Sequence, residues 1–158
     1  MDKLKEMYRK YKEVVNYLIF GVLTTVVNWI TYILLVKLAG FGKSDVRIMA
    51  ANAAAWFVAV LFAFITNKLF VFGSRDLSAA TWLKEAAAFF GARIFTGLFE
   101  TFLPTGLMKL GLNQTLFTIE GFPAKIVTSV LVIVLNYILS KLFVFRSGKK
   151  EASEEKNE

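Results

Sequence analysis

The sequence predicts an all-α integral membrane protein, a bundle of four transmembrane helices built as two tandem parallel helical hairpins. Of its 158 residues, 56% are hydrophobic, which is more apolar surface than a soluble domain of this size buries. Four apolar windows reach the roughly 20 residues that a helix needs to cross a bilayer. The pentapeptide Lys68–Phe72 recurs letter for letter as Lys141–Phe145, so 7 of the 10 residues 65–74 match those 73 positions later. This repeat indicates a duplicated hairpin.

Each predicted span has a feature that defines it. The first is longer than the apolar part of a signal peptide and is expected to stay attached. The second is rich in alanine and aromatic residues, and the third carries Arg93 and Glu100. The fourth has Pro123 in its first turn, where the missing N–H costs nothing. The connections are too short for a soluble domain. The spans are expected at about residues 16–39, 48–72, 84–110 and 122–145.

The two ends of the chain are expected to lie outside the four-span domain of residues 16–147. Residues 1–15 place apolar side chains at helical spacing among basic ones, which is typical of an amphipathic helix on an anionic leaflet or of a solvated leader. Residues 148–158 are charged, lack aromatic side chains, and are expected to form a disordered cytoplasmic tail.

Charge distribution predicts the orientation, because cytoplasmic flanks are enriched in lysine and arginine. Thirteen of these residues flank the side that holds both termini and five flank the other side. Both termini are therefore expected in the cytoplasm. Two passes separate the repeated segments, so the two hairpins are expected to insert in the same direction, as parallel repeats do.

The chain contains no histidine and no cysteine, which removes histidine-based nucleophile systems, thiolate chemistry and the usual metal clusters. It also contains no nucleotide-binding lysine loop. We therefore expect a transporter-like protein rather than an enzyme, with no cofactor, no bound metal and no nucleic-acid partner.

Arg93 is the foremost candidate for binding substrate. Inserting a charged side chain at the centre of a span costs about 2.5–3.5 kcal/mol on insertion scales. Such a residue is therefore expected to pair with another group, to contact water or to have a function. Glu100 lies seven residues further along, on about the same helix face. Two interpretations stay open. Arg93 and Glu100, or either of them with a neighbouring asparagine, form an internal polar network, or Arg93 binds an anionic ligand.

Further polar residues of the spans are candidates with alternatives of their own. Asn67 and Asn136 suit sugar hydroxyls or phosphate oxygens, and equally suit hydrogen bonds between helices. Asn28 is placed as such an interhelical residue. Lys68 and Lys141 end their spans, where a lysine usually extends to the interface. Lys125, near the outer end of the fourth span, is either such an anchor or a phosphate ligand.

Four segments of the spans form a recognisable set: Tyr17–Val22, Phe64–Phe72, Phe89–Arg93 and Leu135–Phe145. Together they resemble the GtrA-like family, and the resemblance covers about residues 14–147. It implies a bacterial inner-membrane protein of cell-surface polysaccharide or teichoic acid glycosylation that moves a polyprenyl-phosphate-linked sugar from the cytoplasmic to the outer leaflet. Family patterns often have asparagine–arginine where this chain has Asn67-Lys68, so the bidentate fork is lost there.

Two other functions remain open. Because related four-span units are fused to polyprenyl-phosphate glycosyltransferases, the chain could be a non-catalytic membrane anchor that recruits such a partner. A small multidrug exporter would also have four spans and a membrane glutamate, here Glu100. Its acid normally lies in the first span, however, and the strong charge bias argues against dual topology. Four helices make a thin bundle, so self-association as a homodimer is expected.

Overall fold

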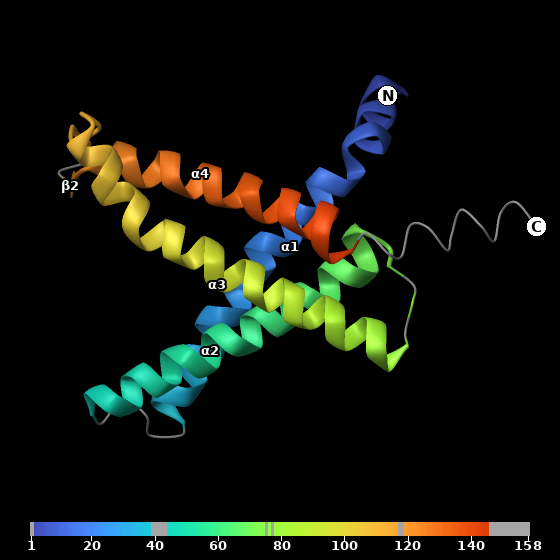
Figure 1. Cartoon of the computed structure of the whole chain (residues 1–158), viewed down its shortest axis with the longest axis horizontal. Coiled ribbons are helices and arrows are strands. Elements are labelled where there is room, and N and C mark those ends of the chain that lie inside the picture. The colour runs from blue at the N-terminus through green and yellow to red at the C-terminus, as the bar shows by residue number, and fades with distance from the viewer. Residues whose placement is uncertain (1, 39–43, 75, 77, 117–118, 146–158) are drawn as a thin grey trace, which may run out of the picture. The chain divides into compact units, whose positions relative to one another are not determined.

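The computed structural model describes residues 2–38, 44–74, 76, 78–116 and 119–145, and it confirms an all-α fold with four long helices (Figure 1). All four are long and apolar enough to cross a membrane, so the chain is a multi-pass membrane protein. The predicted tail 148–158 and the side chains of residues 1–10 lie outside the described part. The elements are α1 (Asp2–Lys37), α2 (Asp45–Thr66), η2 (Asn67–Val71), α3 (Ala79–Lys109), β1 (Thr115–Leu116), β2 (Ile119–Glu120), α4 (Phe122–Leu139) and η3 (Ser140–Val144).

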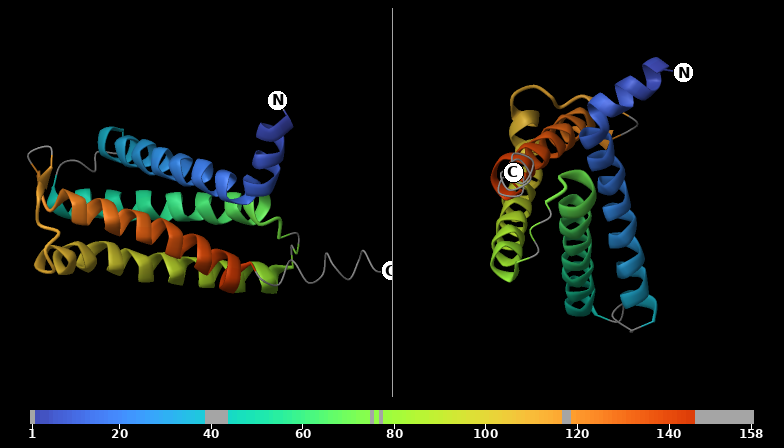
Figure 2. Two further views of the ribbon diagram at one scale, coloured as in Figure 1. Left: turned by 90° about the horizontal axis from the view of Figure 1, so that it is seen from above. Right: turned by 90° about the vertical axis from the view of Figure 1, so that its right-hand side faces the viewer.

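The chain divides into two compact units, residues 1–75 and 76–158, and each is a hairpin of two long helices. In the first unit α1 packs against α2, and in the second α3 packs against α4 (Figure 2). The N-terminal part of α1 turns away from the rest of that helix (Figure 2). The two short strands form an antiparallel pair in the connection between α3 and α4.

Local sequence signals explain where the helices begin. The Ser44 side chain accepts a hydrogen bond from the Arg47 N–H at 3.4 Å, and Asp45 follows in the first turn of α2. Ser78 accepts a bond from the Thr81 N–H at 3.4 Å, so α3 begins at Ala79, five residues before the expected start. This cap lengthens the third helix to 31 residues.

The repeated pentapeptide adopts the same local structure in both units. Each copy lies in a π-helical turn that ends the second helix of its hairpin, with the Phe72 N–H donating to the Asn67 carbonyl and the Phe145 N–H donating to the Ser140 carbonyl. Its aromatic side chains pack on the first helix of their own hairpin, since Phe70 stacks on Phe20 at 5.4 Å between ring centroids. The motif therefore contacts the first helix of its own hairpin and is not only an anchor at the membrane interface.

The duplication extends along the whole second helix of each hairpin. Both α2 and α4 bury one residue in every four over the same five repeat positions, 73 residues apart, which defines one side of each helix. Small residues at such positions let helices pack closely. The buried stripe of α2 holds Ala51, Ala55, Ala59 and Ala63 and continues to Asn67 in η2, and the buried stripe of α4 holds Ala124, Thr128, Val132 and Asn136 and continues to Ser140 in η3.

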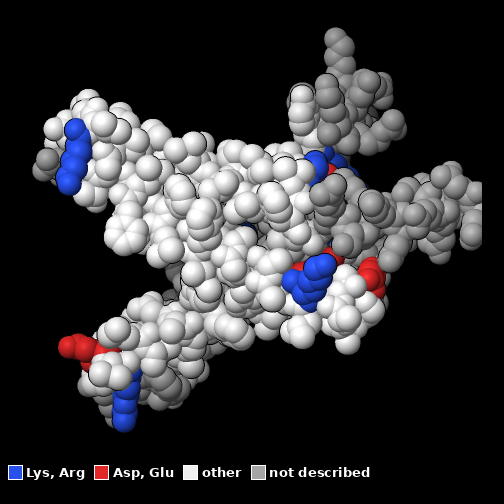
Figure 3. Space-filling model, in the orientation of Figure 1, with Lys and Arg blue, Asp and Glu red and all other residues white. Residues whose placement is uncertain are grey.

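The remaining surface suits a lipid environment. Large apolar side chains of all four helices are exposed, among them Trp29, Phe57, Phe102 and Ile133. On the face shown in Figure 3, most of the charged side chains lie near the ends of the helices. A long uncharged stretch between charged ends is what a hydrocarbon core requires.

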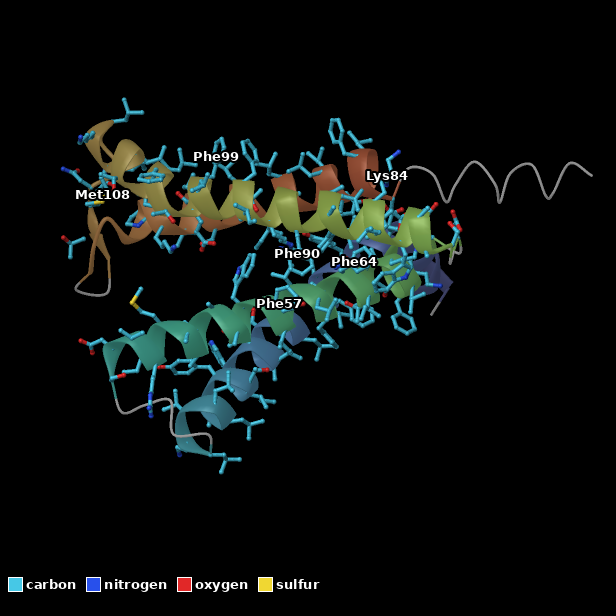
Figure 4. All side chains as sticks on the ribbon, turned by 60° about the horizontal axis from the view of Figure 1, so that its bottom comes forward. Phe57, Phe64, Lys84, Phe90, Phe99 and Met108 are labelled. Atoms are coloured by element: carbon cyan, nitrogen blue, oxygen red, sulfur yellow. The ribbon has the colours of Figure 1, made fainter. Side chains whose placement is uncertain are left out.

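Gly121 at the start of α4 is expected to be needed for hairpin stability. Its φ is +70°, and an added Cβ would overlap the side chain of Met108, which lies at the end of α3 (Figure 4). We expect Gly121→Ala to destabilise the protein by about 1–2 kcal/mol, because a left-handed alanine is strained and Met108 must move. Detergent-induced unfolding followed by circular dichroism measures this change.

Gly97→Ala is the matched control for this substitution. Gly97 lies within α3, and a Cβ there would meet nothing within 4 Å. It is expected to leave stability unchanged or slightly increased, since alanine favours helix more than glycine does. Equal unfolding of the Gly121→Ala protein and the parent protein would contradict the role assigned to Gly121.

Candidate functional site

Arg93 lies at the middle of α3, because 14 residues, or about 21 Å, separate it from Ala79 at the start of the helix. Its side chain is half-buried, and the guanidinium carbon sits 5.1 Å from the centroid of the Phe89 ring. Phe89 is itself fully buried and packs against Phe145. The Arg93 guanidinium makes no hydrogen bond or ion pair to a described residue, whereas the Arg93 carbonyl accepts from the Thr96 hydroxyl at 3.3 Å. A fixed aromatic ring therefore holds a cation whose hydrogen-bonding groups are unused.

Glu100 pairs with Lys125 rather than with Arg93. The Lys125 Nζ donates to the Glu100 Oε1 at 3.2 Å, and this pair joins α3 to α4. Both side chains are about half-exposed. The interpretation in which Arg93 and Glu100 form one internal network is therefore not what the structure shows. The carboxylate nearest to Arg93 along α3 already has a cation.

Asn136 is joined to α3 by a hydrogen bond. The Thr96 hydroxyl donates to the Asn136 Oδ1 at 2.9 Å, and both residues are buried. The same hydroxyl lies 3.0 Å from the Ala92 carbonyl and 3.3 Å from the Arg93 carbonyl, so three acceptors compete for its one proton. Sequence reasoning missed Thr96, although its position three residues after Arg93 places it on a neighbouring part of the same face.

In the first unit, Asn67 and Lys68 are both buried at the end of α2. The Asn67 Nδ2 donates to the Ala63 carbonyl at 2.7 Å, while its Oδ1 has no partner among the described residues. The Lys68 Nζ donates to the Ser74 hydroxyl at 3.0 Å, and the Lys68 carbonyl accepts from the Ser74 N–H at 2.9 Å. Gly73, with φ +61°, turns the chain back to make both contacts. Because Lys68 is fully buried, it departs from the expected interface anchor.

Lys141 and Asn28 are the remaining candidate residues. The half-buried Lys141 donates from its Nζ to the Tyr137 hydroxyl at 3.0 Å and lies 5.3 Å from the centroid of that ring. Asn28 is half-buried on α1, and its side chain makes no hydrogen bond to a described residue. The interhelical bond expected for Asn28 is therefore not seen within its unit.

Most of the polar and charged groups that could bind a substrate therefore lie in the second unit. Along α3 and α4 it holds a cation on an aromatic ring, a buried hydroxyl–amide pair, and an ion pair. Such groups can replace water around phosphate oxygens and hydroxyl groups inside a bilayer. Within the described part of the chain, no three carboxylates gather where they could hold a metal ion.

Comparison with known proteins identifies relatives over nearly the whole chain. A family model described as the GtrA/DPMS transmembrane domain matches residues 16–145. The uncharacterized membrane protein YwcD of Bacillus subtilis is 37% identical over 135 residues, covering 85% of this chain and 98% of YwcD. The cell wall teichoic acid glycosylation protein GtcA of Listeria innocua is 36% identical over 149 residues, covering 94% and 95%. GtcA of Listeria monocytogenes is 33% identical over 156 residues, covering 94% and 100%. No solved structure matches the chain.

Proposed function

The chain belongs to the GtrA/DPMS transmembrane-domain family, and from this premise we propose that it is a translocase for a polyprenyl-phosphate-linked sugar. It would carry the sugar from the cytoplasmic to the outer leaflet for glycosylation of teichoic acid or another cell-surface polysaccharide. Two of the relatives are named for cell wall teichoic acid glycosylation, which supports this process. The bacterial inner membrane is the proposed location, and the excess of lysine and arginine supports cytoplasmic termini.

The observation that carries the proposal is the state of Arg93. A phosphosugar that enters hydrocarbon loses the water that surrounds its hydroxyl groups and its negatively charged phosphate. This loss of hydration costs many kcal/mol. Arg93 offers a half-buried cation at the middle of α3 with no ion pair to a described residue. A guanidinium binds phosphate with paired hydrogen bonds. It therefore suits the charged part of such a lipid.

Lys125 and Asn136 extend this chemistry along α4. Lys125 lies near the start of the helix and Asn136 near its end, 11 residues or about 16 Å apart. Together with Arg93 on α3, these polar groups would replace water at more than one depth. Because the chain has no nucleotide-binding motif, the transport is proposed to run downhill, driven by consumption of the sugar in the outer leaflet.

Reconstitution tests this function. Purified full-length protein is placed in phospholipid vesicles with fluorescent polyprenyl-phosphate glucose in the inner leaflet, and the fraction reaching the outer leaflet is followed by dithionite quenching. We expect exchange well above that of protein-free vesicles within minutes. Vesicles that contain an unrelated four-span protein at the same density control for disturbance of the bilayer.

The same preparation tests the anchor alternative. If the protein gives no exchange above empty vesicles while a glycosyltransferase co-purifies from its native membrane, the translocase proposal is wrong and the anchor function stands. Proton-coupled efflux of an organic cation that is lost in Glu100→Gln would instead indicate an exporter.

A further inference from the structure

The buried stripe of α4 carries polar side chains where the buried stripe of α2 carries alanine. Thr128 occupies the position of Ala55, and Asn136 occupies the position of Ala63. The first hairpin shows that its second helix packs with alanine at these positions. Close packing of the duplicated hairpin therefore does not require the hydroxyl of Thr128 or the amide of Asn136.

Thr128 has an unused hydroxyl in a fully buried place. Its Oγ1 makes no hydrogen bond to any described residue. A buried hydroxyl without a partner is unfavourable, and threonines in helices commonly avoid it by bonding to the carbonyl four residues earlier. Thr128 does not do so. Six other helical threonines here do: Thr24, Thr25, Thr31, Thr66, Thr96 and Thr101.

Asn136 can exchange its partner at little cost. It is only 5% exposed, and its Oδ1 accepts the Thr96 proton, whereas its amide N–H groups have no acceptor among the described residues. If a ligand hydroxyl took the place of Thr96, the Thr96 hydroxyl could return to the Ala92 carbonyl, 3.0 Å away. The amide offers both donors and an acceptor to that ligand.

We propose that Thr128 and Asn136 bind the sugar hydroxyls of the lipid-linked substrate when α3 and α4 separate. This inference rests on the proposed function and assigns the sugar part of the ligand, as Arg93 and Lys125 serve its phosphate. Thr128 and Asn136 lie eight residues, about 12 Å, apart on one side of α4. A sugar hydroxyl that leaves one of these side chains can form a hydrogen bond with the other, further along the same helix.

Movement of α3 away from α4 is consistent with the makeup of this interface. The polar contacts that join the helices include one shared hydroxyl proton and one half-exposed ion pair. Pro104 removes a backbone N–H within α3, so the helix lacks one of its internal hydrogen bonds near Glu100. Both contacts can be replaced by groups of a ligand that carries hydroxyls and a phosphate.

Binding measurements on the full-length protein in detergent micelles test this inference. The probes are polyprenyl-phosphate glucose and the same polyprenyl phosphate without sugar. Thr128→Ala and Asn136→Ala introduce the residues that the first hairpin holds at these positions. Each is expected to weaken binding of the glucose lipid about 5-fold, the loss of one hydrogen bond, and the double variant about 20-fold. Binding of the sugar-free lipid is expected to change less than about 2-fold in each.

Val132→Ala is the matched control, since Val132 lies between the two residues on the same buried stripe and Ala59 is its counterpart. It removes packing without removing a polar group and is expected to leave both affinities within about 2-fold. Equal affinity of the parent protein for the two lipids, or equal weakening for both lipids in the polar variants, overturns the inference. Loss of sugar discrimination in Val132→Ala also overturns it.

The binding experiment and the vesicle experiment test the sugar site and the translocase function independently. A protein that discriminates between the two lipids through Thr128 and Asn136 but moves neither contradicts the translocase and retains the sugar site. A protein that moves the glucose lipid at the parent rate after both substitutions retains the proposed function and contradicts the sugar site. No measurable binding of either lipid contradicts the sugar site as well.

Discussion

Arg93→Ala is expected to slow exchange of polyprenyl-phosphate glucose in reconstituted vesicles by roughly 10- to 100-fold. A hydrogen bond to a charged group contributes about 1.5–3 kcal/mol, and each 1.4 kcal/mol changes a rate by tenfold. Arg93 has no ion pair with a described residue, so its removal should cost transport more than stability. The dithionite assay measures the rate, and detergent-induced unfolding measures the stability of the same variant.

Two further variants show what the arginine contributes. Arg93→Lys keeps the charge but loses the planar fork, so an intermediate rate is expected. Lys84→Ala is the control, because Lys84 is exposed on the same helix (Figure 4) and its loss removes one positive charge without touching the span centre. It should exchange lipid at the parent rate. A parent rate for Arg93→Ala, or equal losses in Arg93→Ala and Lys84→Ala, would contradict the assignment of Arg93 to the phosphate.

The fold was predictable because it depends mainly on local properties of the sequence. Span length and hydropathy determine how many helices cross the bilayer, and the repeated pentapeptide identifies two related hairpins. The duplicated buried stripe could also have been found, since aligning the chain with itself at 73 residues matches Asn67 to Ser140 and Asn136 to Ala63. These two asparagines are thus one helical turn apart in the repeat.

The pairing of charges was not predictable from helix periodicity. Spacing of seven residues places Arg93 and Glu100 on one face, but the partner of Glu100 depends on how α3 is aligned with α4. That alignment is fixed by packing between the helices, including the contact of Gly121 with Met108. Sequence periodicity describes one helix at a time, so contacts between helices lie beyond it.

The burial of Lys68 was hidden for a different reason. A lysine at a span end normally extends to water, and nothing in the pentapeptide itself indicates otherwise. In the structure, Gly73 adopts a left-handed conformation, and Ser74 contacts both the side chain and the carbonyl of Lys68. Lys141, in the identical pentapeptide, instead bonds Tyr137. The tyrosine hydroxyl that Lys141 contacts has no counterpart in the first hairpin, because Phe64 stands at the repeat position of Tyr137.

The Glu100–Lys125 pair gives the second large expected effect, which concerns stability. Glu100 lies nine residues, about 13.5 Å, before the last residue of α3. Lys125→Met would leave the Glu100 carboxylate without the Lys125 ammonium group, which now lies 3.2 Å from it. We expect a loss of about 2–3 kcal/mol in the free energy of unfolding, near the insertion cost of an unpaired charge in a span. Detergent-induced unfolding measures this loss, and Lys109→Met, at the exposed end of α3, is expected to change it by less than about 0.5 kcal/mol.

Double substitutions separate the pair from its individual charges. The neutral combination Glu100→Gln with Lys125→Met removes both charges, so most of the lost stability should return. The exchanged combination Glu100→Lys with Lys125→Glu should also recover stability, because the attraction is retained with its direction reversed. Additive losses in both combinations would show that Lys125 does not act through Glu100. Because Lys125 is also proposed to receive the phosphate, the neutral protein should be stable yet slow in exchange, which distinguishes the cation's role in transport from its role in holding α3 to α4.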